Sequence, residues 1–190
     1  MNRRKKRHAQ DLEASRERIR LFRIQTEDAE AQRVINAIYD AFEGVDRMQA
    51  MSWNDAIVAD SYGFQRAEPL FPDTDSTWEE LVVASWWVGS SLFGYLDPKA
   101  LRYYLPPAMI RNLLGDFTVD PEMALYREYG LSAGVVNAED WDELDAAQVE
   151  AVRSYLRLMA ERHGSQEQDR PIYWNLALEA WDAFQVNPRS

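Results

Sequence analysis

Residues 81–96 form a run of 16 residues without a charged side chain, and this run constrains the fold more than any other feature. Such a run has to be buried, but it is shorter than the roughly 20 apolar residues that a membrane-spanning helix needs. Gly89 and Gly94 also interrupt it. We therefore expect a central core helix over about 77–92, buried on most sides, and no membrane association.

Start and stop signals divide most of the remaining chain into short helices. Side chains that suit an N-cap are followed by helical spacing of apolar residues at five places: Thr26, Ser52, Asp97, Asp120 and Asp145. A last helix is expected to open at 169–171. Pro106 and Pro107 are predicted to end one helix and begin another, because proline lacks the amide hydrogen that a helix interior uses.

These patterns predict an all-α fold, a compact and irregular domain of six to eight helices. No stretch alternates apolar and polar residues for long, so no strand is predicted. Residues 64–75 hold two prolines and no periodicity, and we expect a loop there. The central helix is expected to be packed by large side chains from along the chain: Trp86, Trp87, Tyr104, Leu156, Trp174 and Trp181.

Charge is distributed unevenly along the 190 residues, whose formal net charge is -11. The first 24 residues carry nine basic and three acidic side chains, a net charge of +6, and the remainder therefore carries -17. We predict two parts, a basic N-terminal arm or helix over 1–24 and an acidic helical domain over 25–190. Five basic residues follow one another in the arm: Arg3, Arg4, Lys5, Lys6 and Arg7.

The basic arm has three interpretations. It is a solvated terminus, or it docks on an acidic surface of this chain or a neighbour, or it binds nucleic acid or an anionic membrane. The acidic domain repels phosphates, so nucleic-acid binding is expected through the arm only. Residues 8–20 are rich in charge and lack the apolar stretch of a signal peptide, which favours a cytoplasmic protein.

Catalytic and metal-binding signatures are missing from the sequence. With no cysteine, the chain has no thiolate zinc site, iron–sulfur cluster or cysteine nucleophile. His8 and His163 are far apart in the sequence, and neither belongs to a helical metal-binding pair, although an all-carboxylate calcium or magnesium site stays open. The sequence holds no nucleophile elbow and no P-loop. We predict that the protein is not an enzyme and has no cofactor and no bound metal.

One segment resembles a known family. Residues 92–110, with the core Leu-Asp-Pro-Lys-Ala-Leu-Arg-Tyr-Tyr-Leu-Pro at 96–106, resemble a bacterial family described only as a domain of unknown function. The sequence departs from that family at Lys99, where it usually has Glu, and at Leu101, where it usually has Phe. The resemblance extends over about 26–184 and implies a domain type without an activity, with the basic arm as an addition.

Two groups of residues are candidates for function. An acidic cluster surrounds one aromatic residue: Glu139, Asp140, Trp141, Asp142 and Glu143. Acids around an exposed Trp141 suit the binding of a basic protein; alternatively, these acids favour a helix N-terminus and Trp141 lies in the core. Arg102 and Tyr103 are a possible pocket for a carboxylate or phosphate; alternatively, they only pack and pair within the fold.

These observations lead to three hypotheses about function. The first is a non-catalytic interaction protein, an inhibitor of the immunity or antitoxin kind, whose acidic face binds a basic protein partner. The second is an adaptor or subunit whose basic arm binds nucleic acid or an acidic partner. The third is a small-molecule enzyme or sensor with a pocket at Arg102 and Tyr103.

Overall fold

The structure is a computed structural model that describes residues 23–47, 49–61, 75–85, 87, 89–126, 136, 138–163 and 171–185. Six α-helices lie within these residues: α2 (Ala29–Ala41), α3 (Trp53–Asp60), α4 (Pro98–Leu113), α5 (Glu122–Leu125), α6 (Ala146–His163) and α7 (Pro171–Ala183). Three short 3-10 helices join them: η1 (Trp78–Val82), η2 (Ser90–Tyr95) and η3 (Ala138–Asp140). These described residues contain no strand, which confirms the all-α fold class, and the helix number is close to the six to eight predicted.

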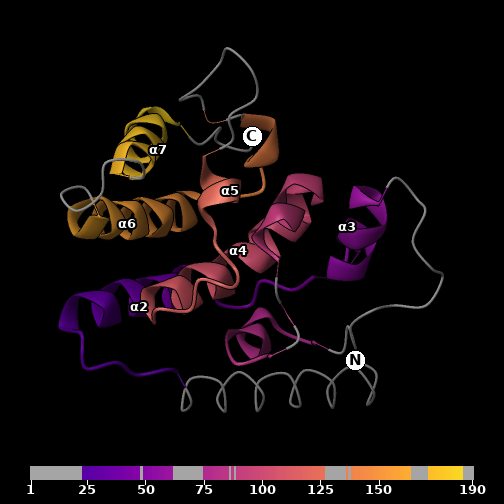
Figure 1. Cartoon of the computed structure of the whole chain (residues 1–190), viewed down its shortest axis with the longest axis horizontal. Helices are drawn as coiled ribbons and strands as arrows, with labels where there is room; N and C mark the ends of the chain where they lie inside the picture. The colour runs from indigo at the N-terminus through magenta and orange to yellow at the C-terminus, as the bar shows by residue number, and fades with distance from the viewer. Residues whose placement is uncertain are drawn as a thin grey trace, which may run out of the picture.

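The central element is α4, and it crosses the middle of the molecule (Figure 1). Asp97 caps its start, because its Oδ1 accepts a hydrogen bond from the amide of Ala100 at 2.8 Å. Pro106 and Pro107 lie inside α4, so the predicted break at this pair is wrong. Each proline removes a main-chain hydrogen bond, at a cost of about 3 kcal/mol. Burial of nearly every residue from Ala100 to Leu113 offsets that cost.

The predicted central helix over 77–92 is also wrong. Residues 78–82 and 90–95 are separate 3-10 helices, and Gly89 has a φ of 99° at the junction. The guanidinium of Arg111 donates to the carbonyl oxygens of Ala84 at 2.9 Å and of Trp87 at 3.0 Å. Because a side chain of α4 satisfies these carbonyls, they do not require a long helix. The expected burial of the uncharged segment holds only in part, since Val83 is 75% exposed and Tyr95 is 40% exposed.

The core is rich in aromatic side chains. The ring of Trp53 lies 5.1 to 5.4 Å from the rings of Trp87, Phe93 and Tyr104, all of which are fully buried. Five of the predicted core residues are confirmed as buried: Trp87, Tyr104, Leu156, Trp174 and Trp181. Trp86, residues 64–74 of the loop predicted over 64–75, and the basic arm as far as residue 22 lie outside the described residues.

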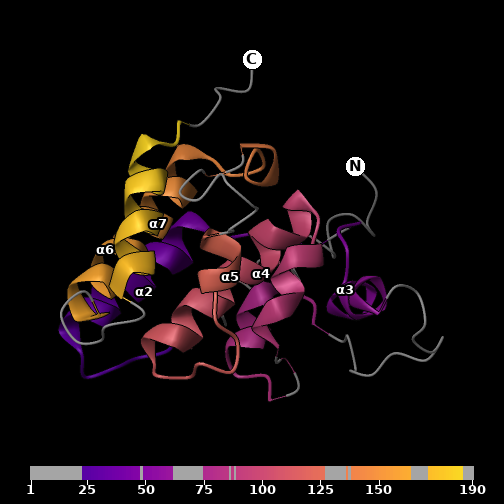
Figure 2. The ribbon, with the colours of Figure 1, turned by 45° about the horizontal axis from the view of Figure 1, so that its top comes forward.

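Helices α2, α6 and α7 lie side by side as a layer, each antiparallel to its neighbour (Figures 1 and 2). Asp28 pairs with Arg162 at one end of α2, and the carbonyl of Ala41 accepts from the Gln148 side chain at the other. In the same way, Arg153 of α6 donates to the carbonyl of Trp181 at 2.9 Å. These contacts bring the C-terminal ends of α2 and α7 and the N-terminal end of α6 to one end of the layer.

Two of the layer's helices begin with side-chain caps. Asp28, rather than the predicted Thr26, caps α2, because its Oδ1 accepts from the amides of Glu30 and Ala31. The cap is displaced because the Thr26 hydroxyl instead accepts from the amide of Asp28. Asp145 caps α6 as predicted, with its Oδ1 2.9 Å from the amide of Gln148.

Among the described residues, no helix is both long and apolar enough to cross a membrane.

Candidate functional site

The predicted acidic cluster runs from η3 to the start of α6. Glu139 and Asp142 are exposed, and Asp140 and Glu143 are half-buried. We call these four residues the η3 cluster. Trp141, by contrast, is only 3% exposed and lies edge-on to Trp181 with 5.1 Å between ring centroids. Trp141 is therefore not an exposed anchor. It fastens the η3 cluster to α7, as the alternative interpretation of the sequence required.

Gln148 fixes the start of α6, which closely follows the η3 cluster in the chain, relative to α2. This side chain is 1% exposed, and its Oε1 accepts from the amide of Asp145 at 3.2 Å and from Nε of Arg102 at 3.1 Å. Its Nε2 donates to the carbonyl of Ala41 at 3.2 Å. Because Gln148 lies in the first turn of α6, it joins that turn to the last turn of α2 and to α4.

A second group of acids lies at the same end of the layer. The indole nitrogen of Trp78 donates to the carbonyl of Phe42 at 3.0 Å, which holds η1 against the end of α2. Glu43, Glu79 and Glu80 meet there, and we call them the η1 cluster. Burial raises the pKa of Glu79, and the negative charges of Glu80 and Glu43 raise it further. Glu43 directly follows Phe42 and Glu79 directly follows Trp78, so the Trp78–Phe42 hydrogen bond brings these two acidic residues to the same place.

The η1 cluster was missed by the sequence analysis. Glu43 and Glu79 lie in segments that are far apart in the chain, and no local pattern connects them. The one available signal was the pair Glu79 and Glu80 beside a helix start, which by itself indicates only a favourable interaction with the helix dipole. Together, the η1 and η3 clusters make one end of the layer acidic, and we refer to it as the acidic end.

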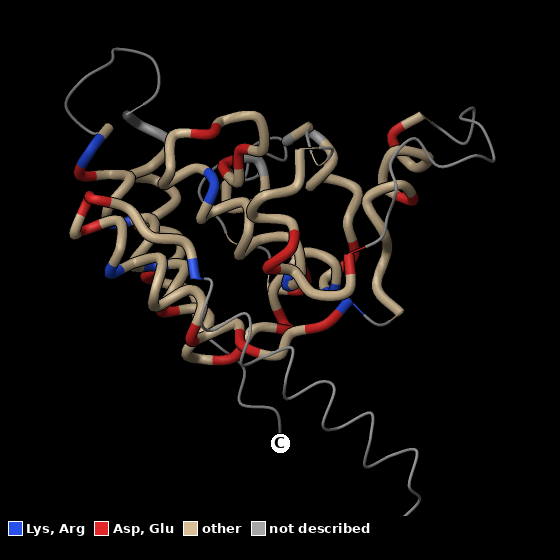
Figure 3. Tube along the Cα trace, turned by 90° about the horizontal axis from the view of Figure 1, so that it is seen from below, with Lys and Arg blue, Asp and Glu red and all other residues tan. Residues whose placement is uncertain are grey.

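Two basic side chains described near the acidic end have partners within the chain. Arg102 donates to Gln148, and Arg23 pairs with Asp40 at 2.7 Å while lying over the ring of Tyr39. Over the whole described part of the chain, 24 acidic residues stand against nine basic ones. Figure 3 shows this excess of acidic residues along the chain trace. The acidic end thus has a negative potential that its neighbouring basic residues do not cancel.

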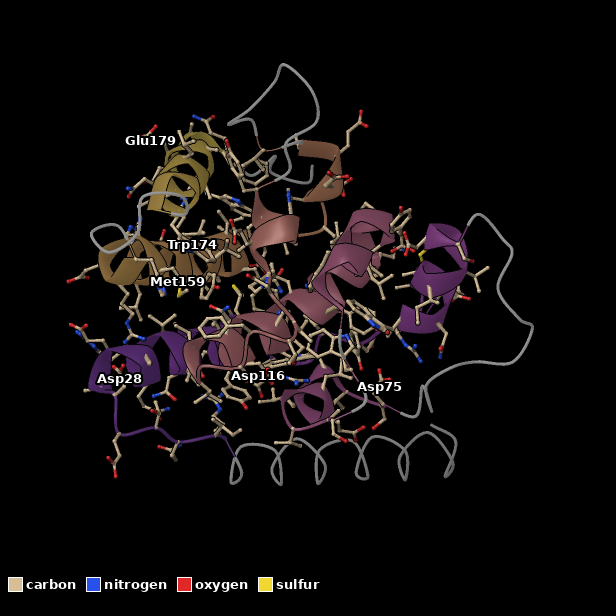
Figure 4. All side chains as sticks on the ribbon, viewed as in Figure 1. Asp28, Asp75, Asp116, Met159, Trp174 and Glu179 are labelled. Atoms are coloured by element: carbon tan, nitrogen blue, oxygen red, sulfur yellow. The ribbon has the colours of Figure 1, made fainter. Side chains whose placement is uncertain are left out.

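A set of buried polar side chains lies around Asp75, which precedes η1 in the chain and is labelled in Figure 4. The hydroxyl of Tyr103 donates to Oδ2 of Asp75 at 2.7 Å, and Nε of Arg47 lies 3.9 Å from the same oxygen. Tyr104 accepts from the amide of Trp53 at 3.0 Å. Burial raises the pKa of Tyr104 to about 12 and that of Tyr103 further, and the hydrogen bond to Asp75 adds to the effect at Tyr103. Both hydroxyls are therefore protonated at neutral pH.

The structure places Arg102 and Tyr103 against different elements. Tyr103 is fully buried and donates to Asp75 ahead of η1, whereas Arg102 is half-buried and donates to Gln148 on α6. Consecutive residues of a helix point about 100° apart, which accounts for the separation. Each side chain thus has a partner within the fold, and the pocket that these two residues suggested stays a prediction.

No metal site was found among the residues that the structure describes: they contain no group of three or more His, Asp or Glu side chains arranged to hold an ion. The arm residues Arg3, Arg4, Lys5, Lys6 and Arg7 lie outside those residues. Arm-mediated binding, like the division of the chain at residue 24, therefore stays a prediction.

Comparison with known proteins gives one match. The model of a family of unknown function, DUF6714, matches residues 30–184, from the first turn of α2 to the residue that follows α7. No curated protein and no solved structure matches the chain. A domain of unknown function over nearly this span is what the resemblance implied. The core motif at 96–106 and the bacterial origin stay predictions.

Proposed function

The chain belongs to the DUF6714 family, whose function is unknown, and we propose that it is a non-catalytic protein whose acidic end binds a basic protein partner. One observation carries the proposal. The end of α2, η1 and η3 come from separate parts of the sequence, and the fold gathers acids from all three at one end of a helical layer. The negative electrostatic potential of these acids steers a basic partner to the surface and raises the rate of association.

In its concrete form, the proposal is an inhibitor of the immunity or antitoxin kind. Inhibitors of this type work by covering a partner's surface, which requires a firmly held binding face rather than reactive groups. The buried Trp141 and Gln148 hold the η3 cluster in place, and Trp78 holds the η1 cluster. In the buried polar group, the protonated hydroxyls of Tyr103 and Tyr104 are suited to holding structure rather than to acting as general bases.

Charge reversal at each cluster tests the proposal. The partner is first captured from extract of the source cells with the full chain, identified and purified, and its affinity is then titrated by calorimetry. We expect Asp142→Lys with Glu143→Lys, and separately Glu43→Lys with Glu80→Lys, to weaken binding by about tenfold or more, mainly through a slower association rate. The melting temperature should change little.

A matched control separates local from global charge. Asp60→Lys with Glu179→Lys changes the net charge by the same amount at exposed positions on α3 and α7. This control should lose much less affinity than either cluster variant. Equal losses in all three variants, or no loss in the cluster variants, would exclude the acidic end as the binding face.

A further inference from the structure

A groove with a volume of about 380 Å³ lies between α2 and α6. Each helix contributes four lining residues at the spacing i, i+3, i+4 and i+7, which places them along one face of that helix. Val34 and Ala37 of α2 and Leu158 of α6 supply apolar surface, and charged side chains rise on both sides. The groove follows about two turns of each helix, a length of roughly 10 Å.

The antiparallel register of α2 and α6 arranges the charges of the groove in levels. Asp28 pairs with Arg162 at one end, and Ala41 accepts from Gln148 at the other. A residue of α2 therefore lies across from the residue of α6 whose number brings the sum of the two to about 190. Glu30 therefore lies across from Glu161, and Arg33 lies across from Arg157. An acidic level is thus followed, one helical turn further along, by a level of two arginines.

The two helices that form this groove differ in charge from the rest of the molecule. Together, α2 and α6 carry four acidic and four basic side chains, a net charge of zero. The described residues as a whole carry 24 acidic and nine basic side chains, so their net charge of -15 lies entirely outside these two helices. Two copies of such a chain repel each other over most of their surface, but not at this face.

We propose that the α2–α6 groove is the contact face of a homodimer. The two copies are related by a two-fold axis that runs across the groove, perpendicular to both helices and midway between the two levels. In the second copy the acidic level and the arginine level therefore follow one another in the opposite order. This arrangement places Glu30 of one copy opposite Arg33 of the second, and Glu161 opposite Arg157, with the same pairs formed reciprocally. The face is therefore complementary to itself in charge, as the isologous contact of a two-fold dimer requires.

Exposure of Arg33 and Glu30 suits this arrangement. Arg157 is 49% exposed and already contacts Glu150 at 2.7 Å and Asp182 at 3.4 Å, so Glu161 of the second copy adds a further carboxylate to this arginine. The Arg33 and Glu30 side chains are 77% and 56% exposed, and the shortest distance between their charged atoms is 3.6 Å. They are thus accessible to a second copy, and the fold does not depend on them. A contact of this length is small, so we expect a dimer in reversible exchange with the monomer. The acidic end stays outside this contact, so the dimer does not depend on the proposed function.

Charge reversal within the groove, followed by mixing, tests the dimer. Sedimentation velocity of the full chain should show a concentration-dependent species of twice the 22.1 kDa protomer mass. Arg33→Glu and Glu30→Arg should each raise the dissociation constant of the dimer by about tenfold or more, because like charges then face each other. An equimolar mixture of the two variants should restore association, since every charge of one copy then faces an opposite charge of the other.

Matched controls lie on other elements. Glu179→Arg on α7 and Lys99→Glu on α4 repeat the two charge changes at exposed positions outside the groove, and Figure 4 shows Glu179 on the far side of α6 from α2. Both controls should dimerise like the unmodified chain. The proposal is overturned if the unmodified chain stays monomeric up to about 1 mM, where association is worth under about 4 kcal/mol. It is equally overturned if neither groove variant weakens the dimer, or if their mixture fails to restore it.

Discussion

Acidic side chains have opposite environments at the two ends of α2. At its start, hydrogen bonds from the amides of Ala31 and Glu30, together with the charge of Arg162, hold the pKa of Asp28 below its usual value. Beyond its other end, burial raises the pKa of Glu79, and the charges of Glu80 and Glu43 add to the effect. The fold therefore favours the ionised form of a carboxyl at one end and disfavours it at the other.

This contrast distinguishes two kinds of surface. Along the α2–α6 groove, arginines and carboxylates alternate. Arg157 also contacts two carboxylates outside the groove, and its hydrogen bond to Glu150, together with the charges of Glu150 and Asp182, raises its pKa. At the acidic end, carboxylates lie beside carboxylates. A balanced surface suits contact with a copy of itself, whereas a surface of one sign suits a partner of the opposite sign.

The largest expected effect is at Trp141, which attaches the η3 cluster to the core. Trp141→Ala removes a side chain that is 3% exposed and packed on Trp181, and it should lower the free energy of unfolding by about 3–5 kcal/mol. Urea denaturation measures the loss. Arg33→Ala in the groove is the comparison and should stay within about 0.5 kcal/mol of the unmodified chain. A similarly small loss at Trp141 would mean that the η3 cluster is not anchored by this residue.

A smaller effect is expected at Gln148, the side chain that joins the first turn of α6 to α2 and α4. Gln148→Leu keeps the approximate shape but removes the hydrogen bonds to Ala41, Arg102 and the amide of Asp145. Because the carbonyl of Ala41 then lacks this donor, we expect a loss of about 1–3 kcal/mol in the free energy of unfolding. Gln148→Glu keeps an acceptor for Arg102 but no donor for Ala41, and a loss equal to that of Gln148→Leu would locate the cost at the Ala41 carbonyl.

Local signals predicted much of this fold. Ser52, Asp97 and Asp145 each cap a helix as expected, because a capping side chain needs only the amides two or three residues ahead of it. Aromatic core residues were also predictable, since large apolar side chains are rarely left exposed together. The acidic residues of the η3 cluster were identified because they are neighbours in the sequence.

What the sequence could not show depends on contacts between distant residues. Arg111 donates hydrogen bonds to the carbonyl oxygens of Ala84 and Trp87. The segment that was predicted to be one helix instead forms two 3-10 helices joined by a link. Pro106 and Pro107 are tolerated because α4 is buried on both sides of them. The η1 cluster joins two distant segments where the indole of Trp78 donates to the carbonyl of Phe42. Each of these features depends on which segments meet, and a single sequence does not state that.

A still smaller effect, visible as a pH dependence, is expected at Glu79. Because its pKa is raised in the folded protein, the folded state binds the proton more tightly than the unfolded chain, whose value is near 4.5. Protonated Glu79 therefore stabilises the folded protein below about pH 4.5, and this stabilisation is lost as the pH rises through the pKa that Glu79 has in the folded protein. Glu79→Gln should raise the melting temperature at neutral pH, and the gain should disappear below about pH 4.5. A lower melting temperature at neutral pH would contradict the crowding of the η1 cluster.

The smallest effect is expected at Asp28, with the opposite sign. Its pKa is lowered from 3.8 in the folded protein, so its contribution is present above that pH and is lost as the pH falls through the folded value. Asp28→Asn keeps a side chain that caps α2 but removes the charge that faces Arg162. We expect a slightly lower melting temperature at neutral pH and no difference in strong acid, while Glu27→Gln, one residue away and exposed, should show neither. If Asp28→Asn instead stabilised the protein at neutral pH, the contrast between the two ends of α2 would be lost.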